Sequence, residues 1–517
     1  MARWLKCTGI VLAALIGVGW AISGLSTHLA AQQVPPPPPP DADTPPALNA
    51  PGTPAPAAAD QSGGEVLTRG PLHEAFAEVV AYNPQPGQIV AKKPPEAIEE
   101  VPPAQKPAGG EFTWIPGYWA WDNDRSDYIW ISGVWRAPAP GMTWVPGYWG
   151  QVANGYQWTS GYWGPATSTT TGRVETQYLP APPQTLESGA SSPQPSADYF
   201  WIPGCWEWQD RWVWRAGHWG PMHTDWVWIP AHYIWTPGGY VFVDGHWDYT
   251  MERRGLAFCP VYYATPVYAQ PGYYYSPAVC IDTPVLTGCL FCRPAYCHYY
   301  FGDYYDASYV RIGIYPWFSP AFVRIGYDPC FVYARWHYGR GDPMWESHMR
   351  EQYAFRVAHV EARPPRTYAA MQIAAPGVRI NIGVPLTRMA ASGGGGFRYE
   401  AVSAAHREEY RKLDSQVRQV QAERRTQEVN ARAQAGPGGL TRPVRMNMPT
   451  ATLATSHQVT NTGGNAGGRN VGAGTTNPGG RVATPYGAAP ARGAAPATTT
   501  RSTRDTSKDR SKDRNER

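Results

Sequence analysis

Tryptophan is the residue whose type and spacing offer the most chemistry in this chain of 517 residues. The pattern W-x-x-G-x-W begins at Trp114, Trp130, Trp144, Trp158, Trp201 and Trp214. Two altered copies begin at Trp228 and Phe242, which makes two arrays of four copies with starts 13 to 16 residues apart. Exposed indole faces stack on sugar rings and on apolar partner surfaces. We therefore predict a ligand platform on the tryptophans that open and close the copies: Trp114, Trp119, Trp130, Trp135, Trp144, Trp149, Trp158, Trp163, Trp201, Trp206, Trp214, Trp219, Trp228 and Trp247.

The alternative assigns the same tryptophans to a hydrophobic core. Of the 24 tryptophans, 19 lie between Trp114 and Trp247, where aliphatic residues are few. Short strands need some bulky side chain to exclude water, and the indoles are the bulk available. In this alternative the aromatic faces bind nothing, or bind only other copies of the chain.

Three histidines, His218, His232 and His246, occupy the fifth position of successive copies. Adjacent strands lie about 5 Å apart, so such a ladder is a weak candidate for a metal site. No carboxylate or cysteine accompanies the histidines at a fixed spacing. We therefore predict half-exposed strand residues and no metal.

The cysteines indicate disulfides formed in an oxidising compartment. We set aside Cys7, because it lies in the apolar N-terminal run that we expect to be a signal peptide or anchor. The remaining candidates are Cys205, Cys259, Cys280, Cys289, Cys292, Cys297 and Cys330. Their number is odd, so one thiol is left over, and spacing alone does not assign partners. The C-x4-C-H segment ending at His298 is only a stretched relative of a haem attachment signal, so we predict no cofactor.

No set of side chains indicates an enzyme. Asp303 and Asp306 could form a carboxylate pair, but aspartates between tyrosines are usually turn residues. The glycine run at 393–396 lacks the Lys and Ser of a phosphate loop. The formal net charge of +4, from 44 basic and 40 acidic residues, is too balanced to indicate a nucleic-acid partner. We expect a protein without catalytic residues.

The repeat predicts short antiparallel strands, four in each array. Each copy opens with aromatic alternation, as at Tyr128 and Trp130, which is typical of a half-buried strand. The two tryptophans of one copy are five residues apart, so a bulge with positive φ at the glycine is needed to keep them on one face. The glycines concerned are Gly117, Gly133, Gly147, Gly161, Gly204, Gly217 and Gly245. The alternative is a type II turn at Pro146 and Gly147 that places Trp144 opposite Trp149.

These copies resemble the repeat of exported bacterial proteins known as the WXXGXW, or YXWGXW, repeat family. The segments GPLHEAF, before the copies, and CHYYFGDYYD, after them, are similar to segments that accompany the repeat in larger members. The resemblance covers about residues 65–368 and implies a repeat domain in the cell envelope, with no activity to carry over. The second array departs from the pattern at Ala231, Tyr233 and Phe242.

The predicted fold is mainly β, with two four-copy arrays of short antiparallel strands or hairpins, a Tyr/Pro-rich β region, two C-terminal helices and long disordered segments. We expect a signal peptide or N-terminal anchor at 1–31, because basic residues precede an apolar run there. Before and between the arrays, we expect a Pro/Ala-rich disordered stalk at 32–64, a partly ordered segment at 65–110, array one at 111–164, a linker at 165–197 and array two at 198–250. After them, we expect a Tyr/Pro/Cys-rich β region at 251–341, a helix at 342–363, a Pro/Gly linker at 364–398, a charged and solvated helix at 399–434 and a disordered basic tail at 435–517.

The expected function is that of a non-enzymatic, exported protein of the periplasm, cell envelope or cell exterior, structural or adhesive. Its partners would be envelope polysaccharide, peptidoglycan or protein, bound through arrayed aromatic residues whose weak contacts add up. It would touch the membrane only through an uncleaved N-terminal segment. One alternative is a self-assembling protein whose tryptophans are only core, and a second is an enzyme of unknown type.

Overall fold

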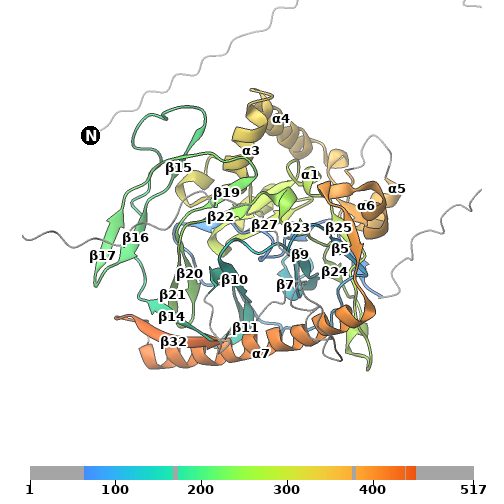
Figure 1. The fold of residues 1–517 in the computed structure, drawn as a ribbon, viewed down its shortest axis with the longest axis horizontal. Coiled ribbons are helices and arrows are strands. Elements are labelled where there is room, and N and C mark those ends of the chain that lie inside the picture. The colour runs from blue at the N-terminus through green and yellow to red at the C-terminus, as the bar shows by residue number, and fades with distance from the viewer. Residues whose placement is uncertain (1–62, 167–172, 375–379, 437, 450–517) are drawn as a thin grey trace, which may run out of the picture. The chain divides into compact units, whose positions relative to one another are not determined.

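The computed structural model describes residues 63–166, 173–374, 380–436 and 438–449. The predicted signal peptide, almost all of the stalk and most of the basic tail lie outside these ranges. The fold is strand-rich but mixed, rather than mainly β, and consists of many small antiparallel sheets with helices between them (Figure 1).

The repeats fold as four two-copy units, each built from a pair of consecutive copies. The first array contains β6 (Thr113–Ile115), β7 (Tyr118–Asp122), β8 (Asp127–Ile131) and β9 (Val134–Arg136), followed by β10 (Met142–Val145), β11 (Tyr148–Val152), β12 (Gly155–Thr159) and β13 (Tyr162–Pro165). The second array contains β15 (Tyr199–Ile202), β16 (Cys205–Trp208), β17 (Trp212–Arg215) and β18 (His218–Pro221), followed by β19 (Trp226–Ile229), β20 (His232–Thr236), β21 (Gly239–Val243) and β22 (His246–Tyr249).

Within each two-copy unit, the first strand pairs with the fourth and the second pairs with the third. Each copy is therefore one strand interrupted at its glycine, and the two copies run antiparallel. The register places the first tryptophan of one copy opposite the second tryptophan of the other, as in Trp144↔Trp163 and Trp149↔Trp158. The predicted turn that would pair Trp144 with Trp149 is wrong, because each tryptophan finds its partner in the neighbouring copy.

The glycine of the motif is required by close packing and not by its φ angle. None of the seven motif glycines has a φ in the left-handed region, so the predicted positive-φ bulge is wrong. Instead, the first indole of the partner copy lies directly over the glycine. A Cβ at Gly161 would lie 2.3 Å from Cζ2 of Trp144, and a Cβ at Gly217 would lie 2.5 Å from Cζ2 of Trp201. No side chain larger than hydrogen fits at this separation.

Two of the three departures from the motif in the fourth two-copy unit, Ala231 and Phe242, fall at the positions of the glycine–indole contact. Ala231 replaces the glycine of the first copy, and Phe242 replaces the first tryptophan of the second copy. These are the two positions that make the glycine–indole contact in the other units. The methyl group of Ala231 is thus accompanied by the phenyl ring of Phe242, which is smaller than an indole, as the close contact requires.

The segment before the repeats is described from residue 63 onward, and its stretch at residues 67–81 is almost entirely buried. Its strands are β1 (Glu65–Val66), β2 (Gly70–Pro71), β3 (Val80–Ala81), β4 (Ile89–Val90) and β5 (Gln105–Pro107). Each pairs with a strand distant in sequence, and Leu67, Leu72 and Phe76 are buried. The partly ordered segment expected here is in fact a central element of the fold.

Further strands complete the sheets around the repeats. They are β14 (Arg173–Leu179), β23 (Gly255–Leu256), β24 (Val261–Tyr262), β25 (Val279–Ile281), β26 (Leu290–Arg293), β27 (His298–Phe301), β28 (Tyr315–Pro316), β29 (Gly326–Tyr327), β30 (Gly383–Pro385), β31 (Tyr399–Ala401) and β32 (Val444–Pro449). β32, which lies in the region predicted as disordered tail, pairs with β14 over six residues. β14 itself begins inside the predicted linker at 165–197.

The helices are more numerous than predicted. They are α1 (Thr283–Leu286), α2 (Ala307–Arg311), α3 (Pro329–Gly339), α4 (Trp345–Ala358), α5 (Tyr368–Ile373), α6 (Leu386–Ser392) and α7 (Ala404–Ala435), with 3-10 turns at Met251–Arg253, Val267–Ala269, Pro294–Tyr296, Phe322–Arg324, Val360–Ala362 and Gly394–Gly396. The first three lie in the region predicted as β, and α5 and α6 lie in the predicted Pro/Gly linker. α3 begins with a proline at its first position, after Asp328, whose side chain accepts a hydrogen bond from the amide of Phe331.

The expectation of a solvated C-terminal helix is wrong. α7 runs beside β11 and β32, and is the long orange helix in Figure 1. Tyr410, Val417, Arg424 and Glu428 on this helix are buried. Beyond the buried apolar residues Tyr410, Val417 and Val420, the helix continues its contact through the buried charges of Arg424 and Glu428. In the ranges described, no helix is long and apolar enough to cross a membrane.

We predict that Gly161→Ala lowers the free energy of unfolding by about 1–3 kcal/mol, because the added methyl group overlaps the Trp144 indole at 2.3 Å and the carbonyl oxygen of Val145 at 2.8 Å. The matched control is Gly150→Ala in β11, where the nearest atom to the new methyl is 3.6 Å away. Denaturant unfolding of both variants measures the difference. In a Trp144→Phe background, Gly161→Ala should cost less, as the Ala231 and Phe242 pairing indicates. Equal costs in both backgrounds would contradict the glycine–indole contact.

Candidate functional site

In three of the four two-copy units, a glutamate from outside the repeats accepts hydrogen bonds where the strands are interrupted at the motif glycine. Glu100 accepts hydrogen bonds from the amide of Gly117 at 2.7 Å and from the amide of Gly133 at 3.0 Å, so one carboxylate joins both copies of the first unit. Nε1 of Trp130 also points to this carboxylate, at 3.4 Å. The strand break leaves these amides without ladder partners, and the carboxylate supplies the acceptors.

Glu74 and Glu187 each bind the tryptophan and the glycine of a single copy, in the second and third units respectively. Glu74 accepts from Nε1 of Trp158 at 2.7 Å and from the amide of Gly161 at 3.0 Å. Glu187 accepts from Nε1 of Trp201 at 3.1 Å and from the amide of Gly204. In the fourth unit, Asp244 of the repeat itself accepts from the amide of Gly245 at 2.8 Å.

The surroundings of Glu74 and Glu100 shift the pKa values of the two carboxyl groups in opposite directions. Nε2 of His298 lies 2.7 Å from Glu74. Burial works to raise the pKa of Glu74, but His298 and the N–H donors outweigh it and hold the pKa below its usual range. For Glu100, burial raises the pKa to about 8 against the opposing effect of the Gly133 and Gly117 amides.

Helix α7 holds the break of the second unit through a buried ion pair. Nη1 of Arg424 donates to the carbonyl of Pro146 at 2.8 Å and to that of Ser160 at 3.2 Å. Nε of Arg424 donates to Glu428 at 2.8 Å, and both side chains are fully buried. Glu428 in turn accepts from the hydroxyls of Tyr148 and Tyr178. The first array is thus fixed to α7 by specific polar contacts.

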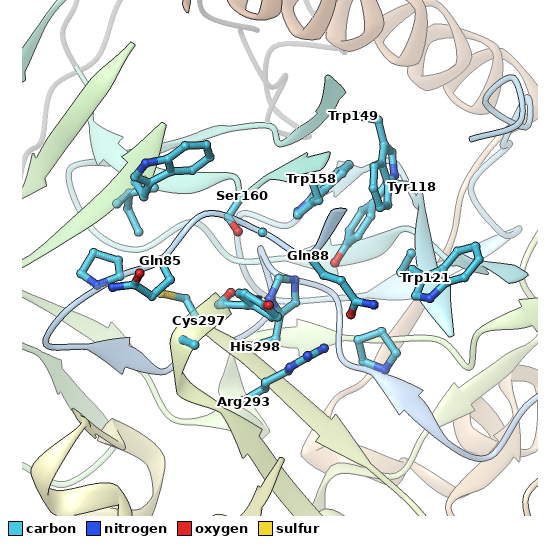
Figure 2. Close-up of a pocket in the computed structure, with 18 of the residues that line it drawn as sticks. Gln85, Gln88, Tyr118, Trp121, Trp149, Trp158, Ser160, Arg293, Cys297 and His298 are labelled. Atoms are coloured by element: carbon cyan, nitrogen blue, oxygen red, sulfur yellow. Dashed lines mark hydrogen bonds between the residues drawn. The ribbon is translucent and has the colours of Figure 1, made fainter. Parts of the chain in front are cut away.

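A pocket opens where the first array meets β26, β27 and the segment before the repeats (Figure 2). The space among its lining atoms, with the open solvent at its mouth included, is about 760 Å³. Its aromatic lining comes from Tyr118, Trp119, Trp121, Trp149, Trp158, Trp235, Tyr296 and Tyr300. Tyr118 and Trp158 are stacked with ring centroids 4.9 Å apart, and Nε1 of Trp149 donates to the carbonyl of Trp119 at 2.8 Å, which fixes these rings in the wall.

Polar groups also reach the pocket. Figure 2 shows Gln85, Gln88, Ser160, Arg293 and His298 around the cavity. Nε2 of Gln88 donates to Asn123 at 3.0 Å, which orients its side-chain amide. Apolar ring faces with a few fixed polar groups are typical of small-ligand sites.

The structure divides the predicted platform tryptophans into two groups. Trp114, Trp119, Trp130, Trp135, Trp144 and Trp163 of the first array are buried. Half-buried are Trp149, Trp158, Trp201, Trp206, Trp214, Trp219, Trp228 and Trp247. Trp119, Trp149 and Trp158 lie together in the pocket lining, whereas none of the six predicted platform tryptophans of the second array lines it.

Of the three histidines predicted as half-exposed strand residues, only His246 is half-buried. His218 is exposed, and His232 is buried with its Nδ1 2.8 Å from the carbonyl of Pro230. His232 and His246 line one small cavity with Asp248 and Arg254. Within the described part of the chain, no group of three or more His, Cys, Asp or Glu side chains could hold a metal ion.

The seven candidate disulfide cysteines are buried free thiols in the structure. Burial raises the pKa of several, including Cys205 and Cys330, both to about 12. Sγ of Cys292 donates to Asp328 at 3.3 Å. Their pairing into disulfides stays a prediction.

Asp303 and Asp306, considered above as a carboxylate pair, bind separate partners. Asp303 accepts from Nε of Arg366 at 2.8 Å. Asp306 caps α2 by accepting from the amide of Ser308 at 2.8 Å.

Sequence reasoning missed Glu74, Glu100, Glu187, Arg293 and the two glutamines of the pocket. Glu74 and His298 lie in the GPLHEAF and CHYYFGDYYD segments, which the sequence does single out as companions of the repeat. Their contact at 2.7 Å gives a physical reason for that association. Arg293 and Gln88 lie in segments with no recognisable signal.

Comparison with known proteins identifies the repeats. Residues 112–136, 140–163, 197–219 and 224–247 each match the model of the WXXGXW repeat, described as two copies. The four matches coincide with the four two-copy units of the structure. No curated protein and no solved structure matches the chain significantly.

We predict that Glu100 makes the protein less stable as the pH rises from about 4.5 to about 8. Its pKa is higher in the folded state than the ordinary glutamate value of about 4.3, so the folded state binds the proton more tightly. The stabilisation is complete below the unfolded value and is lost as the pH passes the folded value, with a slope of up to about 1.4 kcal/mol per pH unit.

Unfolding free energies of the natural protein and of Glu100→Gln across this pH range test the prediction. The amide cannot titrate, so the variant should lose this slope. Identical slopes in the two proteins would contradict the raised pKa of Glu100.

Proposed function

Because the chain belongs to the WXXGXW repeat family, and its repeats line an aromatic pocket, we propose that it is a non-enzymatic, exported binding protein of the cell envelope that holds a glycan in this pocket. The basic residues and apolar run within 1–31 support export. The pocket lining is the observation that carries the proposal.

The proposal rests first on the wall of the pocket. Trp121, Trp149, Trp158 and Trp235 are half-buried, so part of each ring is accessible. The apolar C–H faces of a sugar ring pack on such indoles.

The polar groups at the pocket fit the hydroxyl groups of a sugar. Gln85 and Gln88 present amides, and Ser160 presents a hydroxyl. Each is exposed or half-buried, so each can exchange water for a ligand hydroxyl at small cost. Direct hydrogen bonds would orient the sugar, while the aromatic wall would supply most of the affinity.

A second candidate function is self-association through the second array. All six of its predicted platform tryptophans are half-buried, and β16 and β17 present the cross-strand pairs Trp206–Trp214 and Trp208–Trp212. Aromatic residues left partly exposed along a hairpin are suited to packing against another copy. This surface is separate from the pocket, so the two functions can be tested independently.

We expect Trp121→Ala to weaken binding of the full-length protein to soluble peptidoglycan fragments or envelope polysaccharide about tenfold, by removing one stacking face. The matched control is Trp226→Ala. Both tryptophans are half-buried strand residues paired with a tyrosine, Tyr128 for Trp121 and Tyr249 for Trp226, but only Trp121 lines the pocket. Titration calorimetry with a panel of oligosaccharides measures the affinities.

Equal losses in the two variants would contradict the pocket as the binding site. Binding that is unaffected by Trp121→Ala but lost in Trp206→Ala would place recognition on the second array. Sedimentation of the protein alone tests self-association, which Trp206→Ala should weaken and Trp121→Ala should leave unchanged.

A further inference from the structure

Arg293 differs from the other buried arginines of the structure. Five arginines are less than a tenth exposed in the ranges described: Arg69, Arg136, Arg254, Arg293 and Arg424. Four of them have a carboxylate oxygen within 3.0 Å, supplied by Asp124, Asp248 (twice) and Glu428. No carboxylate within ion-pair distance of Arg293 is found in the described part of the chain. A buried charge without a partner is costly, so this exception calls for a reason.

The immediate neighbours of the Arg293 guanidinium are neutral. It lies 4.3 Å from the centroid of the Tyr296 ring. It also hydrogen-bonds the hydroxyl of Tyr300, and burial raises the pKa of that hydroxyl, so Tyr300 carries no charge at neutral pH. Nε of Arg293 is buried and has no hydrogen-bond partner.

The nearby acidic groups are already paired. Glu74 has His298 at 2.7 Å, and Asp122 has Arg125 at 3.1 Å. Neither is within ion-pair distance of Arg293. The arginine thus has an unused N–H donor and an unbalanced charge, at the wall of a pocket that takes a ligand under the function proposed above.

Arg293 and the indoles occupy different sides of the pocket. In Figure 2, Arg293 lies across the cavity from Trp149 and Trp158, with Gln88 between them. A sugar ring placed on the indoles would therefore direct its substituents toward the guanidinium. Carboxylates suit this group because they accept two parallel N–H bonds from one arginine.

We propose that the ligand of this pocket is an acidic saccharide, whose ring packs on the tryptophans and whose carboxylate pairs with Arg293. The proposal rests on the glycan-binding function above and specifies its ligand. A single arginine balances a single negative charge, which fits one carboxylate on each bound sugar. The uronic acids and the lactyl-bearing sugar of peptidoglycan both meet this description.

The test compares acids with matched neutral sugars on the full-length protein. The probes are oligogalacturonate and its methyl ester, oligoglucuronate and its methyl ester, and N-acetylmuramic acid with N-acetylglucosamine. We expect at least one acid to bind about tenfold more tightly than its neutral partner. Arg293→Gln should abolish the preference and leave binding of the neutral sugar unchanged, whereas Arg293→Lys should keep part of it. Arg125→Gln is the control, because Arg125 also lies over a tyrosine ring but outside the pocket.

Thermal unfolding supplies a readout that does not depend on the ligand. If Arg293 is an uncompensated charge, Arg293→Gln should unfold at the same or a higher temperature than the natural protein. A marked loss of stability would show that the guanidinium is structural and would overturn the proposal.

The outcomes separate this inference from the function on which it rests. Equal binding of every acid and its neutral partner, with both weakened by Trp121→Ala, would leave the glycan pocket standing and overturn the acidic ligand. No binding of any probe would overturn both. If the preference for acids persists in Arg293→Gln, another group binds the carboxylate and the role proposed for Arg293 is wrong.

Discussion

The structure depends on a contact in which the indole of one repeat copy covers the glycine of the next. A side chain at that glycine would place its Cβ within 3 Å of the ring in the seven copies that keep it. The contact sets the register of each two-copy unit, because only one alignment places every indole over a glycine. It also explains why the repeat occurs in pairs of copies: one copy alone has an indole without a glycine and a glycine without an indole.

The same contact leaves backbone amides that other parts of the chain must satisfy. The strands are interrupted at the glycine, so no neighbouring strand accepts from these amides, and carboxylates from outside the repeats accept instead. Glu74 and Glu100 belong to the segment that precedes the repeats, so that segment must run through the interior. Glu74 also brings β27 close through His298. The pocket forms at this meeting point, and its lining is a consequence of how the strand interruptions of the repeats are satisfied.

Much of the repeat was predictable from the sequence, because it depends on short-range pattern. The spacing of the aromatic residues predicts strands, and the glycine marks the break. The pairing partners and the reason for the glycine were not predictable, because both depend on the neighbouring copy. α7 shows the same limit: its Arg, Glu and Gln content favours a solvated helix, yet Arg424 and Glu428 are buried because Pro146, Ser160 and three tyrosines offer them partners. Three of the predicted platform tryptophans lie in the pocket, but Arg293 and Gln88 reach it from distant segments that carry no motif.

Proton chemical shifts of the motif glycines test the central claim most directly. A glycine beneath an indole face has its Hα resonances moved upfield by the ring current, and selective labelling of glycine isolates these signals in the full-length chain. We predict upfield shifts for Gly117, Gly133, Gly147, Gly161, Gly204, Gly217 and Gly245, each lost when the covering tryptophan is replaced by leucine. We predict ordinary shifts for Gly109 and Gly141, where a Cβ would have no atom within 4 Å. Ordinary shifts at the motif glycines would contradict the glycine–indole contact on which the fold, the carboxylate closures and the pocket all depend.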